Sequence, residues 1–203
     1  KYIVIEDQIQ ARNPNASVAV LPTQSLPLNN EQADALQMVT DSVGKDRRDV
    51  ILLYGVTGSG KTEVYLQAIQ ACLDRGEESI VLVPEIALTP QTIERFRGRF
   101  GNVISILHSH LSDGERYDEW TRINDGSVKI AIGARSAVFA PFRNLGLIVV
   151  DEEHEPSYKQ DRVPRYNARD IAVMRGHFEN LTVVLGTATP ALESMYNVEC
   201  GKY

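Results

Sequence analysis

The feature that most constrains the fold is the octapeptide GVTGSGKT at residues 55–62, which directly follows the apolar run VILLY and precedes a segment of helical spacing. A strand, a glycine-rich loop and a helix in this order are the setting that a phosphate-binding loop requires. Glycine lets the loop turn tightly around phosphate oxygens, and the helix presents its positive end to them. The alternative is an ordinary glycine-rich turn, which rarely has this context.

The residues of this loop have distinct expected roles. Lys61 should reach the β and γ phosphates of a nucleoside triphosphate, and Thr62 can supply a hydroxyl to Mg²⁺. The candidate nucleotide-binding residues of the loop are Gly55, Thr57, Gly58, Ser59, Gly60, Lys61 and Thr62.

Short runs of β-branched residues recur along the rest of the chain, at residues 50–54, 80–83, 103–107, 128–132, 147–150 and 182–185. Between most of these runs, apolar residues recur at the spacing of a helix. Parallel strands need long crossovers, and strands buried on both faces are continuously apolar. The pattern therefore predicts an α/β fold with a doubly wound, mostly parallel sheet.

The first 27 residues are rich in proline and asparagine, which is typical of a linker or of the tail of a preceding domain. A helix is expected to begin at Asn29 or Asn30, so the compact domain should span residues 28–203. The 203 residues suit about one domain. Because the chain starts at Lys1 without a methionine, we expect it to be a piece of a longer protein.

Charge and cysteine content limit the function classes. The net charge of −6 should repel nucleic acid overall, so any nucleic-acid binding must come from a local surface. Two cysteines provide neither a disulfide framework nor a zinc cage, which favours a reducing cytosol. No apolar run approaches the roughly 18 residues of a membrane span, so no membrane partner is expected.

A second candidate element is DEEH, which follows the apolar run at residues 147–150. Asp151 would emerge at the carboxyl end of a buried strand, where it can anchor Mg²⁺. Glu152 is placed to polarise a water for attack on the γ phosphate. Taken alone, the acidic cluster could be a solvated loop, because acidic loops of that kind are common.

Downstream, TVVLGTATP places Thr187 and Thr189 beyond another apolar strand. Their hydroxyls could bond to His154 and transmit the state of the γ phosphate, which would make His154 a catalytic candidate with Lys61 and the acidic pair. The alternative is a threonine-rich turn that caps the next helix.

In this order, the three motifs resemble the first motor lobe of a superfamily 2 helicase. The strings LNNEQADAL, VLVPEIALTPQ, GARSAVFAP, HEPSYKQDRVPRYNARDIA and GTATPALES narrow the resemblance to the bacterial primosomal N-prime family of replication-restart DNA helicases, over roughly residues 28–203.

This resemblance implies a RecA-like lobe that uses ATP and Mg²⁺ within a 3′-to-5′ DNA helicase. It implies single-stranded and forked DNA, other primosome proteins and single-stranded DNA-binding protein as partners. It also implies a location in the bacterial cytoplasm, at the nucleoid. The zinc-binding cysteines of the family would lie outside this chain.

The resemblance also assigns residues. Gln32 takes the place of a glutamine that recognises adenine, although an exposed helical glutamine would look the same. Thr89, Arg135 and Ser136 match segments that contact the DNA backbone, where the alternatives are a capping threonine and a surface arginine.

The segment after DEEH holds Tyr158, Lys159, Arg165 and Tyr166. Rings interleaved with cations can stack bases and hold a strand, and in related helicases an aromatic loop here couples strand binding to hydrolysis. The alternative is that the tyrosines pack the loop onto the sheet.

Two other functions use the same loop: a small-molecule kinase, and a nucleotide-binding module that does not translocate. An isolated lobe should hydrolyse ATP slowly, because in such motors a second lobe supplies an arginine that accelerates hydrolysis.

Overall fold

The computed structural model of the chain describes residues 21–44 and 49–203. Most of the expected linker, residues 1–20, lies outside the described residues. Residues 21–29 contain neither helix nor strand. The division into a linker and a domain at residue 28 stays a prediction.

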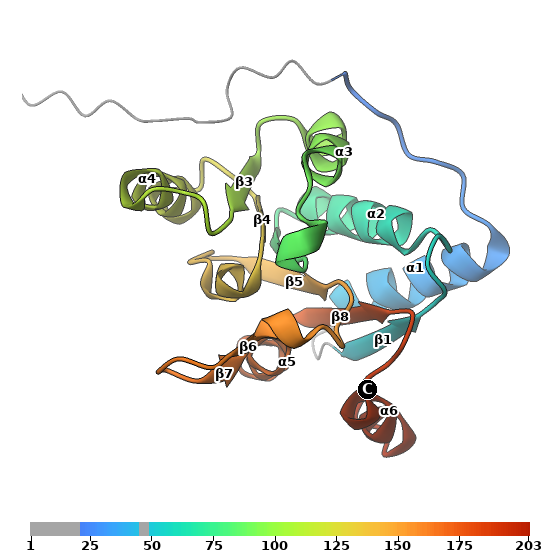
Figure 1. Cartoon of the computed structure of the whole chain (residues 1–203). Coiled ribbons are helices and arrows are strands. Elements are labelled where there is room, and N and C mark those ends of the chain that lie inside the picture. Colours follow the sequence, from blue (N-terminus) through green and yellow to red (C-terminus); the bar gives the residue numbers. More distant parts are fainter. Residues whose placement is uncertain (1–20, 45–48) are drawn as a thin grey trace, which may run out of the picture.

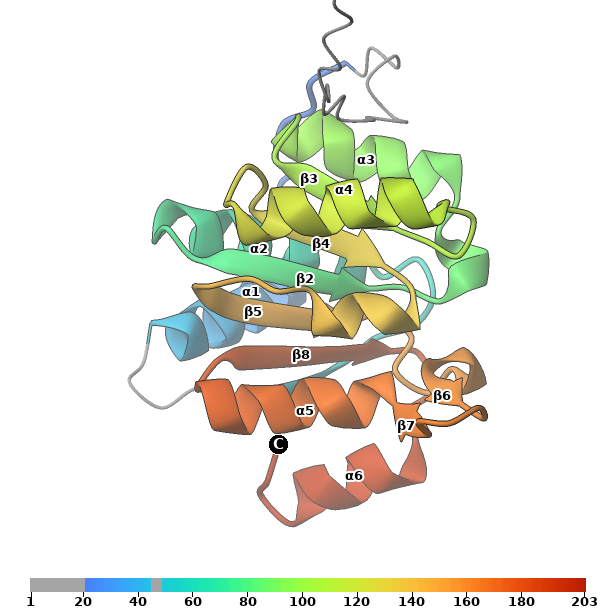
Figure 2. The same cartoon turned by 90° about the vertical axis from the view of Figure 1, so that its left-hand side faces the viewer.

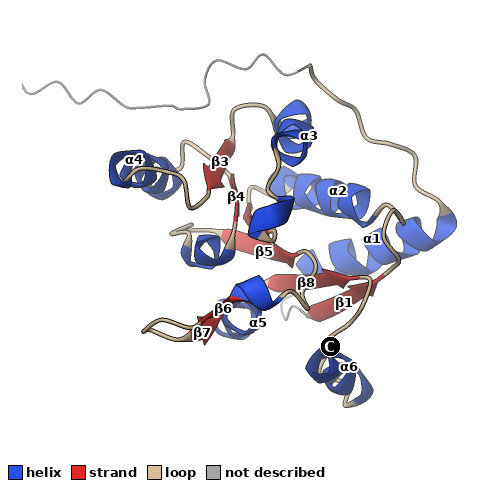
Figure 3. Cartoon of the chain, in the orientation of Figure 1, coloured by secondary structure: helices blue, strands red, loops and turns tan. Residues whose placement is uncertain are grey.

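A sheet forms the centre of the molecule (Figures 1 and 3). Its six strands run parallel in the order β1-β8-β5-β2-β4-β3. The predicted doubly wound parallel sheet is thereby confirmed, with a strand at each of the six apolar runs. The strands are β1 (Val50–Tyr54), β2 (Glu78–Leu82), β3 (Ile104–Leu107), β4 (Ile130–Gly133), β5 (Leu145–Val150) and β8 (Thr182–Thr187).

Helices cover both faces of the sheet (Figures 1 and 2). One face carries α1 (Asn30–Val43), α2 (Lys61–Asp74) and α3 (Pro90–Phe100), and the other carries α4 (Asp113–Asn124) and α5 (Ala168–Glu179). The remaining elements are short: η1 (Glu85–Ala87), η2 (Arg135–Phe139), η3 (Pro156–Tyr158), the hairpin β6 (Lys159–Gln160) and β7 (Tyr166–Asn167), and the last helix, α6 (Leu192–Glu199).

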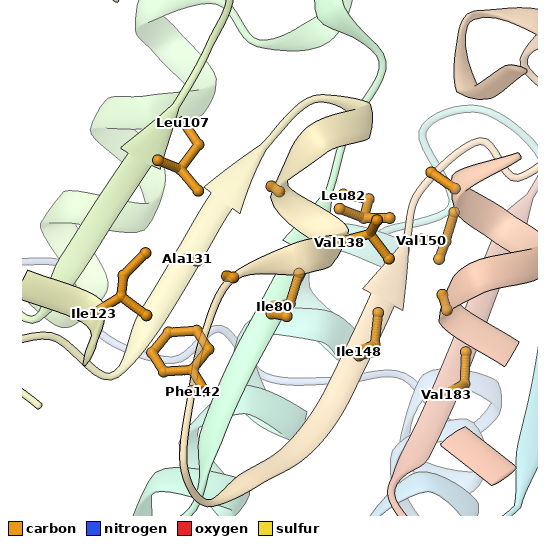
Figure 4. Close-up of a cluster of buried hydrophobic side chains, with 14 of the residues drawn as sticks. Ile80, Leu82, Leu107, Ile123, Ala131, Val138, Phe142, Ile148, Val150 and Val183 are labelled. Atoms are coloured by element: carbon orange, nitrogen blue, oxygen red, sulfur yellow. The ribbon is translucent and has the colours of Figure 1, made fainter. Parts of the chain in front are cut away.

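The strands are continuously apolar because alternate side chains enter two different cores. Ile80 and Leu82 of β2 pack with Ile148 of β5 on the face of α4 and α5 (Figure 4). Their neighbours Val81 and Val149 pack against the helices of the opposite face. Both faces of the central strands are therefore closed to water.

The register of the strands brings their carboxyl ends to one edge of the sheet, within two residues of one another. Tyr54 pairs with Thr187, and Leu185 pairs with Val150. Val150 also pairs with Leu82 on the other side. The loops that follow these strands, which carry the candidate motifs, therefore emerge side by side.

Helix α1 begins where the sequence predicts it, with Asn29 as its N-cap. The Asn29 side chain accepts from the Gln32 backbone N–H at 2.8 Å, and the Gln32 side chain accepts from the Asn29 N–H at 2.9 Å. This reciprocal capping box satisfies two backbone donors that the first helical turn leaves unpaired.

The segment at residues 21–26, which we call the strap, lies across α2 and α3. The Thr23 backbone N–H donates to the Gly98 carbonyl at 2.8 Å, and the Leu26 N–H donates to Glu63 at 3.0 Å. Arg99 pairs with the same Glu63 carboxylate at 2.8 Å. Burial opposes ionisation of Glu63, but hydrogen bonds from Gln67, Arg99 and Leu26 bring the pKa of Glu63 below its ordinary value.

Substitution of Gly98 by alanine should loosen the strap, because a Cβ there would lie 3.0 Å from the Leu21 carbonyl oxygen and 3.1 Å from Thr23 Cγ2. Alanine favours the helix itself, so the global stability should change little. We expect the Thr23 amide to exchange with deuterium about tenfold faster, the loss of roughly one hydrogen bond. Gly44→Ala, where the new Cβ makes only ordinary contacts at 3.5 Å, should leave that amide unchanged.

Candidate nucleotide-hydrolysis site

A cavity of about 590 Å³ opens at the carboxyl edge of the sheet. It is bordered by the glycine-rich loop, by the acidic turn after β5 and by the strap. The predicted site residues that line it are Thr57, Gly58, Ser59, Gly60, Lys61, Thr62, Asp151 and Glu152. Two motifs that lie about ninety residues apart in the printed sequence therefore face one space, as the sequence predicts.

The loop conformation explains its glycines. Gly58 and Gly60 have φ angles of +81° and +84°, a region that side chains other than glycine rarely adopt. A Cβ on Gly60 would also collide with the Gln32 amide. That amide donates to the Ser59 carbonyl at 2.7 Å, so Gln32 holds the loop from α1. Its contact with adenine stays a prediction.

Lys61 begins α2 and lies along the loop. Its ammonium donates to the Gly55 carbonyl at 2.6 Å and lies 4.0 Å from the Glu152 carboxylate. The lysine and the proposed water-activating carboxylate are thus close enough for one phosphate group to lie beside both.

Asp151 is fixed from two sides. Its backbone N–H donates to the Leu82 carbonyl at 2.9 Å, and the Tyr65 hydroxyl donates to its carboxylate at 3.1 Å. Burial raises the pKa of Asp151, and the hydrogen bond from Tyr65 partly offsets this rise. Burial also raises the pKa of Tyr65 well above its ordinary value, so its hydroxyl stays protonated and able to donate.

The oxygen atoms at this point fit Mg²⁺. Thr62 and Asp151 line both the main cavity and a smaller one beside it. A hydroxyl and a carboxylate are hard oxygen ligands, and Mg²⁺ commonly completes its shell with water and substrate phosphates. The loop glycines and Lys61 likewise fit a triphosphate.

Glu152 has a φ angle of +47°, which is uncommon for a residue with a side chain. This turn places its carboxylate between Lys61 and His154, whose Nδ1 lies 3.7 Å away. Such strain persists only where surrounding contacts hold it, and it is frequent at functional sites.

The expected contact between His154 and a threonine is present. His154 Nδ1 lies 2.8 Å from the buried Thr187 hydroxyl, which also accepts from the Thr189 backbone N–H at 3.0 Å. The Thr187 carbonyl accepts from the Gly55 N–H at 3.0 Å. The alternative of a capping threonine is wrong for α6, because its N-cap is Ala191, which makes no side-chain cap.

The expected DNA-contact residues Thr89, Arg135 and Ser136 follow neighbouring strands at the same edge. Thr89 is exposed and caps α3 by accepting from the Thr92 N–H at 3.3 Å. Ser136 is exposed. Arg135 instead donates to the Lys159 carbonyl at 2.6 Å, and its guanidinium lies 6.0 Å from the centre of the Tyr166 ring.

The two loop tyrosines differ. Tyr158 is 1% exposed, and its hydroxyl donates to the Asp151 carbonyl at 2.6 Å, so in this structure it packs the loop and cannot stack a base. Burial raises the pKa of Tyr158 well above its ordinary value. Tyr166 is only partly buried and lies edge-on to Phe139, with ring centres 5.1 Å apart. Lys159 and Arg165 are exposed beside it.

Sequence reasoning missed two residues that support the site. Tyr65 lies four residues after Lys61 on α2, so helical spacing could have indicated that it faces the same site. Glu153 is buried beneath the acidic turn. The sequence carried no signal for this, since three adjacent acidic residues read as a solvated loop.

Residues 29–198 match the DEAD/DEAH box helicase family. The chain is 51% identical over 192 residues to replication restart protein PriA of Bacillus subtilis, a match that covers 95% of this chain and 24% of that protein. It is 52% identical over 204 residues to PriA of Chlamydia trachomatis, covering all of this chain and 27% of that protein. The chain thus spans about a quarter of the length of these curated relatives.

Two solved structures resemble the fold. RecG bound to a three-way DNA junction matches 87% of this chain and 23% of its own, with a TM-score of 0.65 and 23% identity. The Hef helicase domain of Pyrococcus furiosus matches 84% of this chain and 35% of its own, with a TM-score of 0.59 and 19% identity. Within the described residues, no helix has both the length and the apolar character needed to cross a membrane.

The support that Tyr65 gives to Asp151 can be tested with Tyr65→Phe, which removes only the hydroxyl. The buried carboxylate would lose a donor, so the free energy of unfolding should fall by roughly 1–3 kcal/mol in urea titration. Tyr117→Phe, at an exposed position of α4, should change it by less than about 0.5 kcal/mol. Equal stability of the two variants would contradict a hydrogen bond of this strength.

Proposed function

The chain belongs to the DEAD/DEAH box helicase family, and from this premise we propose that it is the ATP-binding motor lobe of a DNA helicase that translocates 3′-to-5′ and restarts stalled replication forks. The observation that carries the proposal is the distance of 4.0 Å between Lys61 and Glu152 across one cavity. The similarity to PriA proteins supports the role in replication restart.

In this proposal, the loop amides and Lys61 bind the β and γ phosphates of ATP, while Gln32 supports the loop and reads the adenine. Thr62 and Asp151 hold Mg²⁺, which when bound screens the phosphate charge and orients the terminal phosphate. Tyr65 keeps the Asp151 carboxylate directed into the site.

Glu152 polarises the attacking water, since its carboxylate lies at the cavity beside Lys61. His154 then links the acidic turn at residues 151–154, which we call the hydrolysis turn, to β8 through Thr187. The Thr187 carbonyl in turn accepts from the Gly55 N–H of the phosphate-binding loop. Attack and release at the terminal phosphate would change these contacts and, with them, the position of the segment that follows Thr187.

DNA contacts are proposed along the same edge. Thr89, Ser136, Lys159 and Arg165 are exposed there, and hydroxyls and cations are suitable donors to phosphates. Arg135 and Tyr166 order the hairpin that presents these cations, and Thr189 follows Thr187 in the linked segment. Tyr158 contributes to coupling through its bond to Asp151 rather than by stacking.

The wider assignments rest on family resemblance. We propose that the whole protein acts on single-stranded and forked DNA in the bacterial cytoplasm, at the nucleoid. Its protein partners would be other primosome proteins and single-stranded DNA-binding protein. Zinc is expected only in parts of the protein beyond this chain. The second lobe is expected there too, and the arginine that it supplies would raise the rate of ATP hydrolysis roughly 10³- to 10⁵-fold.

The family match disfavours a small-molecule kinase, and a module that binds nucleotide without translocating would show no response to DNA. The deciding experiment is the ATPase rate of the full-length gene product with and without single-stranded DNA. Stimulation by DNA supports the motor, and a phosphorylated metabolite would support the kinase.

Lys61→Ala should lower kcat for ATP hydrolysis at least about 10²-fold, because a preorganised cation on the transferred phosphate is lost. The fold should remain intact, as judged by circular dichroism. Lys202→Ala removes an exposed lysine beyond α6 and should keep the wild-type rate. Unchanged turnover in Lys61→Ala would refute the site assignment.

The double variant Lys159→Gln/Arg165→Gln should retain basal ATPase activity and lose stimulation by DNA. If both cations contact phosphates, the slope of log affinity against log salt should become shallower by about 1 to 2. The matched control is Arg143→Gln/Lys202→Gln. It removes the same charge from exposed positions near the amino ends of the strands. Equal DNA affinity of the two double variants would place the contacts elsewhere.

A further inference from the structure

Glu153 lies between two residues with proposed roles in hydrolysis, Glu152 and His154, but its own side chain does not border the nucleotide cavity. Its carboxylate is 0% exposed. A carboxylate buried in this way must be paired and hydrogen-bonded, because its removal from water is otherwise strongly unfavourable. Its partners therefore show what the residue holds together.

Three donors converge on this carboxylate, one from α5, one from α6 and one from the N-cap residue of α6. Oε1 accepts from the Ala191 backbone N–H at 2.7 Å. Oε2 accepts from the Ser194 hydroxyl at 2.9 Å and from the Arg169 guanidinium at 3.1 Å. The Glu153 backbone N–H donates to the Gly186 carbonyl at 3.0 Å. One residue thus connects the hydrolysis turn to β8, α5 and α6.

At the start of α6, Glu153 accepts from the backbone N–H of the N-cap residue Ala191, one of the donors that a helix leaves unpaired. The residue at the cap position, Ala191, has no side-chain acceptor, so the first turn of α6 lacks a local partner. A carboxylate beside the positive end of a helix is also favourable electrostatically. The start of α6 is therefore held by a residue from the hydrolysis turn.

For α5, the link runs through Arg169 in the first turn of the helix. This helix follows directly on β7, the second strand of the hairpin that carries the exposed cations Lys159 and Arg165. A force on the hairpin would therefore reach Glu153 through Arg169.

We propose that Glu153 is a positioning residue that couples α6 and the hairpin-bearing helix α5 to the hydrolysis turn. The inference deepens the proposed function and rests on it. Glu153 does not touch the nucleotide. It fixes the backbone next to Glu152, whose positive φ angle makes the direction of its carboxylate depend on that backbone. A strand that moves the hairpin would thereby change the alignment of Glu152.

The experiment compares Glu153→Gln with Glu119→Gln in the full-length protein. Both positions are 2% exposed, and both carboxylates pair with an arginine, but Glu119 pairs with Arg122 within α4. Glu153→Gln should lower DNA-stimulated kcat at least about tenfold, because small displacements of a reacting group are costly. The KM for ATP should change less than about twofold. Glu119→Gln should keep both values.

A second readout follows the contacts between Glu153 and the start of α6 directly. Hydrogen exchange at the Ala191 amide and in the first turn of α6 should be faster in Glu153→Gln and unchanged in Glu119→Gln. Wild-type exchange in this turn would overturn the proposal, as would a kcat equal to that of the control or an effect confined to KM.

Should Glu153→Gln fail to fold, Ser194→Ala decides the question, because it removes a single bond to the same carboxylate. A lower kcat with unchanged KM supports the coupling, and an unchanged kcat overturns it. Failure of the proposed function is distinguishable, since the wild-type protein itself would then show no stimulation by DNA.

Discussion

The site depends on the parallel register of β1, β8 and β5. Strand β8 lies between the other two, so the loop after β1 and the acidic turn after β5 are separated by one strand, and β5 ends two residues short of the last pair between β1 and β8. Only a parallel arrangement places the carboxyl ends of all three strands at one edge, where open α/β sheets bind their ligands. Thr187, at the end of the middle strand, contacts both neighbours, through Gly55 and through His154.

Buried polar side chains hold the acidic turn from beneath. Tyr65 bonds to the carboxylate of Asp151, Tyr158 bonds to its carbonyl, and Glu153 anchors the same turn to α5 and α6. A site of this kind needs its reacting groups fixed before the substrate binds, since small errors in placement cost much of the rate. The strained Glu152 backbone is sustained by this support.

The outer contacts of the lobe are more exposed than the catalytic ones. Arg135 and Tyr166 order a short hairpin whose cations Lys159 and Arg165 face solvent, and the strap crosses α2 beside the cavity. Both features lie where a strand or another domain can reach them. The rigid hydrolysis turn is thus bordered by elements that can respond to binding.

The sequence by itself determined the six strands, the start of α1 and the phosphate loop, and it left a contact of His154 with Thr187 or Thr189 as one of two alternatives. These follow from local periodicity, from glycine at positive φ and from the rule that parallel strands end together. Tertiary structure alone decided that Tyr158 is buried, that Arg135 bonds to a loop carbonyl and that Glu153 bonds to the start of a distant helix. Periodicity reports whether a side chain is buried in a long regular element, but Tyr158 lies in the three-residue helix η3 and Glu153 in a turn. The partner of a polar group there depends on which distant segments the sheet order brings within hydrogen-bonding distance.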